Sequence, residues 1–272
     1  MKKYIVDKEI IIYDFLKNHM SLSKNSIKNL LHEEYIYVNN KCITKYNYIL
    51  KENDIVEVKT TKNIDIIYED KDIIVVNKPF NLLTVSTSKE KNKTLYKQVS
   101  DYVKEKNKNN KIFIINRLDK DTSGIVMFSK KENIKRLYQD NWNDIVKERK
   151  YIAIVNGIIK EKEGTIKSYL KEDNNHIVHS SKDGKLSITN YKVLKEKNNI
   201  SLLDINILTG RKNQIRVHLK EKGYPILGDS KYGIKKKGRM YLHAYKLILK
   251  NPKTNKIMEF KCEVPIDFSK II

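Results

Sequence analysis

The stretch Asn116 to Gly124, NRLDKDTSG, decides how the fold of this chain is interpreted. It lies between two apolar runs, Ile112–Ile115 and Ile125–Phe128. Short apolar runs bounded by turn residues are typical of buried strands, so the sequence predicts two core strands joined by a polar turn. Such a turn holds a carboxylate rigidly, which suits a reactive group. Taken alone, the stretch leaves open a solvated loop with no chemical role, because loops are polar by default.

The overall charge points to a polyanionic partner. The chain has 272 residues, of which 40% are hydrophobic, and this length allows one large domain or a large and a small one. Its 55 Lys and Arg against 33 Asp and Glu give a net charge of +22. A charge of this size favours nucleic acid as the partner. Compositional bias is the alternative, since the chain is rich in Lys, Asn and Ile.

Several classes of protein lack support in the sequence. The two cysteines, Cys42 and Cys262, are far apart, which indicates no disulfide framework and favours a reducing cytoplasm. His176 and His179 have no further ligand at zinc spacing, so we expect no metal. No signal-peptide core and no stretch of about 20 apolar residues is present, so we expect a cytoplasmic protein without a membrane partner. Neither dinucleotide nor Walker phosphate motifs occur, and no nucleophile elbow is present.

Residues 11–58 predict a small first domain. Helical spacing of Ile12, Phe15 and Leu16 precedes a second helix that Ser23 is placed to cap. Strands follow at 35–38 and 54–58, with a turn at Asn39-Asn40. This order resembles the S4 RNA-binding domain, in which Glu34 and Asn40 stand where glycine is usual. The resemblance implies a basic RNA-binding face that includes Lys24 and Lys28; a solvated helix face is the alternative.

Residues 59–64 predict a linker, and residues 65–272 a second domain dominated by strands. Pro79 ends an apolar strand that starts at Ile73. The remaining elements are expected as helices at 95–103, 131–146 and 211–221, and as strands at 64–68, 151–155, 165–170, 177–179, 186–194, 201–208, 245–249 and 258–264. The second domain is therefore expected to be α+β with a mixed sheet.

A series of motifs in this second domain resembles the RluA-type pseudouridine synthases. The matching segments are Val76–Pro79, Asn116–Gly124, Lys150–Ala153, Leu208–Leu219, Pro225–Asp229, Tyr232–Gly233 and Leu242–Ala244. Each motif is moderately specific, and their occurrence in this order is very specific. Asn116 stands where the family commonly has histidine, and Lys212-Asn213 and Phe80-Asn81 also depart from its usual pattern.

The resemblance implies isomerisation of uridine to pseudouridine, with Asp119 as the catalytic carboxylate. Asp119 either attacks C1′ or promotes loss of a 2′ proton, and the sequence leaves both routes open. Both need an ionised carboxylate, which burial disfavours unless a cation opposes it. By resemblance Arg216 is that cation. Tyr151 is expected to stack on the uracil and to help remove the C5 proton.

The resemblance also implies how RNA is held. Arg117 is expected to fill the space that a flipped uridine leaves, and Ile215 to pack beneath the base. Further contacts to RNA are expected from Lys78, Arg211 and Gln214. The expected substrate is large-subunit ribosomal RNA, with transfer RNA as the alternative, and the enzyme is expected to act as a monomer without a cofactor. Two other functions stay open, a non-catalytic RNA-binding or ribosome-assembly protein and a DNA-binding protein.

Overall fold

The computed structural model describes residues 2–20, 22–32, 34–58, 64–88, 90–233 and 238–272. The chain divides into two compact units, Met1–Asn63 and Ile64–Ile272. Most of the linker expected at 59–64 lies outside the described residues, whereas Ile64 belongs to the second unit.

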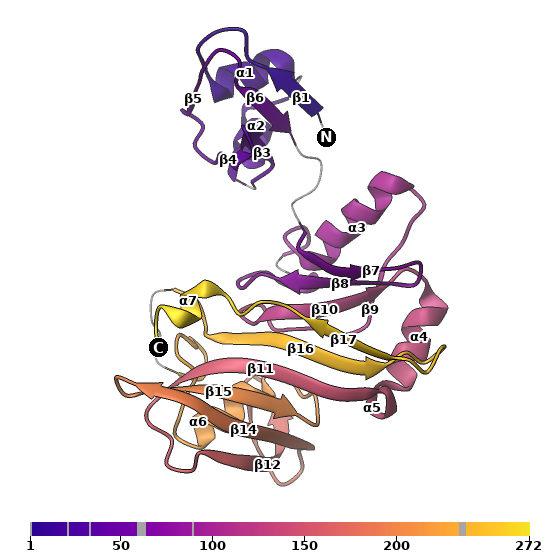
Figure 1. Cartoon of the computed structure of the whole chain (residues 1–272), viewed down its shortest axis with the longest axis vertical. Helices are drawn as coiled ribbons and strands as arrows, with labels where there is room; N and C mark the ends of the chain where they lie inside the picture. The colour runs from indigo at the N-terminus through magenta and orange to yellow at the C-terminus, as the bar shows by residue number, and fades with distance from the viewer. Residues whose placement is uncertain (1, 21, 33, 59–63, 89, 234–237) are drawn as a thin grey trace. The chain divides into compact units, whose positions relative to one another are not determined.

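The first unit combines two helices with two small sheets (Figure 1). Its elements are β1 (Lys2–Ile5), β2 (Ile10–Ile11), α1 (Ile12–His19), α2 (Lys24–His32), β3 (Ile36–Val38), β4 (Lys41–Cys42), β5 (Ile49–Leu50) and β6 (Ile55–Val58). The larger sheet has the order β1-β6-β3-β4, and β2 pairs with β5. Because β1 pairs with β6 along its whole length, this unit begins before the expected boundary at residue 11.

Local chemistry explains the helices and turns of the first unit. Phe15 and Leu16 of α1 and Ile27 and Leu31 of α2 are buried in one apolar core. The backbone N–H of Ser26 donates to Ser23 Oγ over 3.2 Å, as expected for a capping serine. Four described residues in its turns adopt left-handed backbone: Glu34 at φ 64°, Asn39 at φ 47°, Asn40 at φ 67° and Asn53 at φ 68°. Asparagine tolerates this conformation well, whereas glutamate does so at a cost.

The second unit is a large mixed sheet with helices against it (Figure 1). Its elements are β7 (Ile66–Glu69), β8 (Ile73–Lys78), α3 (Leu95–Lys106), β9 (Phe113–Ile114), β10 (Ser123–Ser129), α4 (Glu132–Asp140), α5 (Trp142–Ile145), β11 (Val146–Asn156), β12 (Glu163–Glu172), β13 (Val178–Ser180), β14 (Lys185–Lys197), β15 (Ile200–Ile207), α6 (Gln214–Glu221), β16 (Leu242–Lys250), β17 (Ile257–Lys261) and α7 (Ile266–Ser269).

The sheet order is β13-β12-β14-β15-β11-β16-β10-β8-β7, with β17 paired to β16 and β9 to β10. Among the described strands, only β10 and β16 pair in parallel, through Ser123–His243 and Gly124–Ala244. Gly124 has φ +116°, and a Cβ there would lie 2.2 Å from the carbonyl oxygen of Ala244. Only glycine therefore allows the loop before β10 to enter the sheet at this point.

Both faces of the sheet are covered where β8 and β10 lie. On one face Ile74 and Val76 of β8 pack with Leu95, Val99 and Val103 of α3. On the other, Ile73 and Val75 pack with residues of α4, α5 and β16. A strand that is buried on both faces has a continuous apolar sequence, which is why β8 and β10 could be predicted from the sequence. The α+β class with a strand-dominated mixed sheet is confirmed.

Two predicted helices have different bounds in the structure. The helix expected at 131–146 is broken at Asn141, whose side-chain amide donates to the Leu137 carbonyl over 2.8 Å, and α5 begins at the next residue. A side chain that bonds the backbone in this way competes with the helix. The helix expected at 211–221 begins only at Gln214, because Asn213 is left-handed, with φ 54°.

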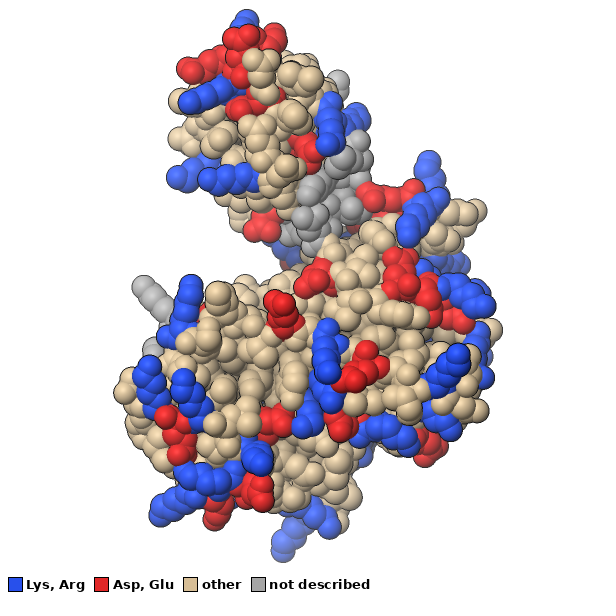
Figure 2. Space-filling view, viewed as in Figure 1, with Lys and Arg blue, Asp and Glu red and all other residues tan. Residues whose placement is uncertain are grey.

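The basic excess is not gathered into one patch on the face that Figure 2 shows. Lys and Arg side chains are spread among acidic ones over this face.

Within the described ranges, every helix is too short or too polar to cross a membrane.

Candidate active site

The loop between β9 and β10 is tied down on both sides of Asp119. The Asn116 side-chain oxygen accepts from the Met127 N–H over 2.7 Å. The hydroxyl of buried Thr84 donates to the Leu118 carbonyl over 2.6 Å. The Thr122 N–H donates to the Asp119 carbonyl over 3.2 Å. These bonds fix the backbone that carries Asp119, whose side chain keeps 31% of its surface exposed.

Lys78 is a fourth tether of this loop and not a contact for RNA, which corrects the sequence expectation. Its side chain is completely buried at the end of β8. The ammonium donates to the carbonyls of Pro79, Leu82 and Lys120, over 2.9, 2.7 and 3.0 Å. Burial lowers the pKa of Lys78 to about 7, although the charges of Asp121 and Asp119 oppose that shift. An ammonium enclosed in this way has no donor left for a nucleotide.

Arg216, on α6, joins two carboxylates. Its Nε and Nη2 donate to the two oxygens of Asp229 over 2.8 Å each, and its Nη1 lies 3.3 Å from Asp119 Oδ2. Burial alone would lower the pKa of Arg216, but Asp229 and then Asp119 raise it above its usual value. A bidentate pair of this kind fixes the guanidinium plane as well as its charge.

Asp229 is the close partner of Arg216. It lies in the motif Pro225–Asp229, and no role was predicted for it from the sequence. Its side chain has no exposed surface. Burial would raise the pKa of its carboxyl, yet the Arg216 hydrogen bonds and the N–H groups of Lys231 and Tyr232 hold it below the usual value. The signal in the sequence was its position just after Gly228, at the end of a turn.

The side of the guanidinium facing Asp119 is completed by Asn213 and Tyr232. The Asn213 side-chain oxygen accepts from Arg216 Nη1 over 3.3 Å, and its amide donates to the Tyr232 hydroxyl over 2.9 Å. The guanidinium also lies 5.1 Å from the centre of the Tyr232 ring. Asn213 therefore orients the guanidinium of Arg216.

Tyr151 lies beside these groups, on β11. Burial raises the pKa of its hydroxyl to about 12, Arg149 opposes this shift, and the negative charge of Asp119 adds to it. The hydroxyl is therefore protonated at neutral pH. Arg149, which the sequence reasoning did not single out, donates to the Leu208 carbonyl over 2.7 Å and lies against Gly210.

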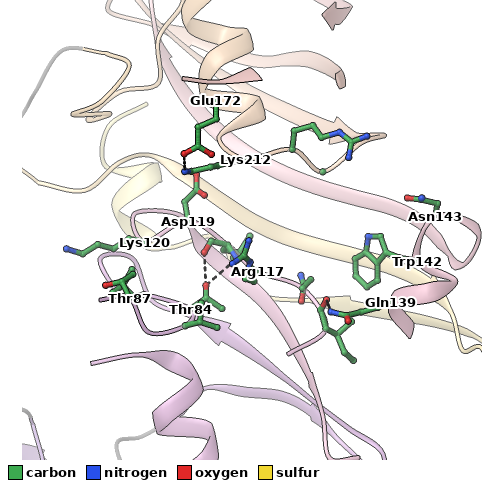
Figure 3. Close-up of a pocket in the computed structure, with 17 residues that line it drawn as sticks. Thr84, Thr87, Arg117, Asp119, Lys120, Gln139, Trp142, Asn143, Glu172 and Lys212 are labelled. Atoms are coloured by element: carbon green, nitrogen blue, oxygen red, sulfur yellow. Dashed lines mark hydrogen bonds and ion pairs between the residues drawn. The ribbon is translucent and has the colours of Figure 1, made fainter. Parts of the chain in front are cut away.

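Asp119 faces two adjoining hollows. A small pocket of about 100 Å³ is lined by Asp119, Tyr151, Ile215, Arg216 and Arg117, among others. The sequence-predicted catalytic residues thus surround one space. A groove of about 840 Å³ also begins at Asp119 and Arg117 and continues to Gln139, Trp142 and Asn143 (Figure 3).

The other predicted RNA contacts fall into three groups. Ile215 and Arg211 line the small pocket, and Arg211 is exposed. Gln214 is 3% exposed, and its amide bonds Thr209, Arg211, Ile188 and Thr189, so it shapes the start of α6 and has no free group for RNA. Lys24 and Lys28 are exposed on α2 of the first unit, and the Lys28 ammonium lies 5.3 Å from the centre of the Tyr46 ring.

The arrangement is a carboxylate beside a fixed cation, facing a small pocket that also holds a phenol. It suits nucleophilic or acid–base chemistry on a ligand in the pocket. Within the described ranges, no group of three or more His, Cys, Asp or Glu side chains is placed to hold a metal ion.

Comparison with known proteins identifies the family. The family model for RNA pseudouridylate synthase matches residues 72–221, which is more than half of the chain. An RNA pseudouridine synthase of Mycoplasma pneumoniae is 30% identical, over 94% of this chain and 89% of its own length. The YlyB RNA pseudouridine synthase of Bacillus subtilis is 29% identical, over 92% of this chain and 88% of its own.

A solved structure supports the fold. Human RNA pseudouridylate synthase domain containing 4 superposes with a TM-score of 0.63 at 22% identity, covering 75% of this chain and 90% of that one. Fold and relatives together define an isomerase that modifies RNA. The chain belongs to the RNA pseudouridylate synthase family. The expected resemblance to pseudouridine synthases, and with it the expected class of enzyme, is confirmed.

Proposed function

We propose that this enzyme isomerises specific uridines in structured RNA, with Asp119 as the reacting carboxylate. The observation that carries the proposal is the position of Asp119. It is held on a loop tethered at Asn116, Leu118 and Lys120, it contacts the guanidinium of Arg216, and it faces the small pocket. Asp121, the other carboxylate of the loop, lines neither the small pocket nor the groove.

The proposed chemistry starts from an ionised Asp119. The guanidinium of Arg216 opposes the cost of placing this charge in a partly closed site. Asp119 then attacks C1′ or promotes loss of the 2′ proton, the N1–C1′ bond breaks, and the base turns and rejoins through C5. The C5 proton leaves at the end. The protonated Tyr151 hydroxyl and aromatic ring line the space in which the base would turn.

Arg117 is the residue proposed to fill the space that the flipped uridine leaves in the RNA. Its side chain is exposed at the border of the small pocket and the groove, and it makes no hydrogen bond or ion pair with a described residue. A cation without a protein partner is available to enter the stack when the uridine leaves it. Ile215 supplies the apolar floor of the pocket.

The proposed substrate is large-subunit ribosomal RNA, with transfer RNA as the alternative. The first unit supports this assignment if it acts as an S4-like RNA-binding domain. It has a helix pair packed on a sheet, and Glu34 and Asn40 have left-handed backbone at the positions where S4 domains usually have glycine. A second contact through exposed Lys24 and Lys28 raises the effective concentration of RNA at the catalytic unit.

The test is a map of pseudouridine in ribosomal and transfer RNA from cells with and without this protein. We expect one site or a few sites to lose pseudouridine when the protein is absent, and to regain it when the wild-type chain, but not Asp119→Asn, is restored. The class of RNA that contains those sites decides the substrate. An unchanged map would contradict the proposal and favour a protein that binds RNA without modifying it.

A further inference from the structure

A groove of about 840 Å³ extends beyond Asp119. It adjoins the small pocket of about 100 Å³ and shares Asp119 and Arg117 with it. Pockets of about 300–1,000 Å³ hold one drug-sized ligand, so the groove has room for a nucleotide besides a base in the small pocket. We propose that Trp142, at the far part of this groove, forms a second nucleotide subsite on which a base flanking the target uridine stacks. The inference rests on the proposed function, because it assigns the groove to the RNA strand that enters the active site.

Trp142 is suited to act as a fixed stacking surface. It begins α5, directly after the break at Asn141, and it is half-buried. One part of its indole packs against the core formed by β8, α4 and β16, and another part lines the groove. A side chain held by packing loses little freedom on binding, and stacking on a flat aromatic ring accepts any base.

Polar groups for the edge of a base lie beside Trp142 (Figure 3). The Gln139 amide nitrogen donates to the carbonyls of Ile114 and Ile115, over 3.1 and 3.2 Å. These bonds fix the amide, and its oxygen has no hydrogen bond to a described residue. Asn143, one residue after the tryptophan, also lines the groove and is exposed. An amide oxygen accepts from base N–H groups, and an amide nitrogen donates to base carbonyls and ring nitrogens.

The charges along the groove suit a nucleic-acid strand. Arg117, Lys120, Arg211 and Lys212 line it together with the acidic Asp119 and Glu172. Glu172 is paired with Lys212, so these two charges offset each other. Arg117, Lys120 and Arg211 are the cations left to face a strand. Single-stranded RNA is held in this general way, by cations along its backbone and by aromatic rings under its bases.

The chain offers a direct probe, because Trp142 is its only tryptophan. The full-length wild-type protein would be titrated with pentauridylate while the intrinsic fluorescence is followed. Binding would be measured independently by the anisotropy of fluorescein-labelled pentauridylate. We expect saturable quenching that follows the binding curve. An abasic pentamer with the same phosphates should bind through charge alone and leave the fluorescence unchanged.

Substitutions give a second, independent readout. Trp142→Leu should weaken pentauridylate binding about 5- to 150-fold, the range for the loss of one stacked base. Trp142→Phe, which keeps a ring, should bind within about threefold of wild type. Circular dichroism and urea unfolding of both variants show whether they fold. The wild-type fluorescence titration needs no substitution, so the inference stays testable even if Trp142→Leu does not fold.

The failures of the two proposals can be told apart. If pentauridylate binds without changing the tryptophan fluorescence, or fails to bind at millimolar concentration, the Trp142 subsite is wrong. Equal quenching by the abasic pentamer would also overturn it. Asp121→Asn should quench like wild type, because Asp121 lines neither the groove nor the small pocket. If quenching occurs but the wild-type protein forms no pseudouridine in any cellular RNA, the subsite stands and the proposed function is wrong.

Discussion

Arg216 is bound more closely by Asp229 than by Asp119. Two hydrogen bonds of 2.8 Å join its guanidinium to Asp229, whereas a single 3.3 Å contact joins it to Asp119. The exposed surface of the two side chains in the closer pair is 6% for Arg216 and 0% for Asp229. The buried pair therefore sets the position of the cation, and Asp119 meets a guanidinium that is already in place.

Removal of Asp229 should damage the fold as well as the activity. Asp229→Ala leaves the buried Arg216 with only its 3.3 Å contacts to Asp119 and Asn213, and the loss of the close pair costs about 3–5 kcal/mol of unfolding free energy. Urea unfolding measures this loss, and Asp229→Asn, which keeps the shape and one acceptor, should lose less. An Asp229→Ala variant as stable as wild type would show that the pair is not needed to hold Arg216.

The same pair gives stability with a defined dependence on pH. The pKa of Asp229 is lower in the folded chain than its usual value of about 3.9. Its contribution is therefore fully present above about pH 4 and is lost as the pH falls through the lower, folded value. Unfolding free energies measured below pH 4 should converge for wild type and Asp229→Asn.

Two buried histidines should weaken the fold at higher pH than Asp229 does. Burial lowers the pKa of both His218 and His243 to about 4, and the positive charge of Arg239 also acts on His243. The unfolded chain binds their protons between about pH 6.5 and 4, so stability falls over this window as the pH is lowered. A shift of this size corresponds to about 3 kcal/mol for each histidine.

The check is urea unfolding at several pH values for wild type, His218→Gln and His243→Gln. Each variant should show a shallower loss between pH 6.5 and 4 than wild type. His218 bonds the hydroxyls of Thr189 and Ser168, so glutamine at 218 retains polar groups for them. An unchanged slope in both variants would mean that the histidines do not govern the acid response.

Lys78 should affect stability and loop position but not the binding of RNA phosphates. Lys78→Met leaves three buried carbonyls without their donor, and we expect a loss of about 2–4 kcal/mol, because each unsatisfied buried group carries a cost. The salt dependence of RNA affinity should keep its slope, since no phosphate contact is removed. Lys120→Ala, an exposed neighbour that lines the groove, is the matched control and should lower the slope.

Asn116→His should stay active at neutral pH. The Asn116 oxygen accepts from the N–H of the buried Met127, and a neutral imidazole nitrogen is able to take over that bond. As the pH falls through about 6.5 the imidazole is protonated and stops accepting, so the variant should lose activity at a higher pH than wild type. Asn116→Ala should lose about 1–3 kcal/mol of stability at every pH. A folded but inactive Asn116→His at pH 8 would contradict this account.

The positions of strands could be predicted from the sequence better than the partners of individual side chains. β8 and β10 stood out because strands buried on both faces are uninterrupted apolar runs. The loop that carries Asp119 stood out because it is a polar turn between β10 and the apolar run before it. The prediction of Lys78 as an RNA contact was wrong because its burial depends on carbonyls from two segments, the residues just after it and a loop residue 42 positions away. A lysine next to a buried strand usually reaches solvent, and only the tertiary structure shows that this one does not.

The partners of Arg216 show a similar limit. Asp119 was linked to Arg216 through the family resemblance, although the two are 97 residues apart. Asp229 is only 13 residues from Arg216, but the sequence did not predict their ion pair. Spacing along the chain does not reveal which carboxylate faces a guanidinium across a turn. Gln214 was misread for the same reason, since its amide is satisfied by residues of β14 and of the turn before α6.

The central claim is that Asp119 is the reacting carboxylate, and release of tritium from C5 tests it most directly. RNA from cells that lack the protein, labelled with tritium at C5 of uridine, would be incubated with the purified full chain. Wild type should release tritium, Asp119→Asn should be slower by at least about 10³-fold, and Asp121→Asn should stay within about tenfold of wild type. Release at the wild-type rate by Asp119→Asn, with RNA still bound, would contradict the account.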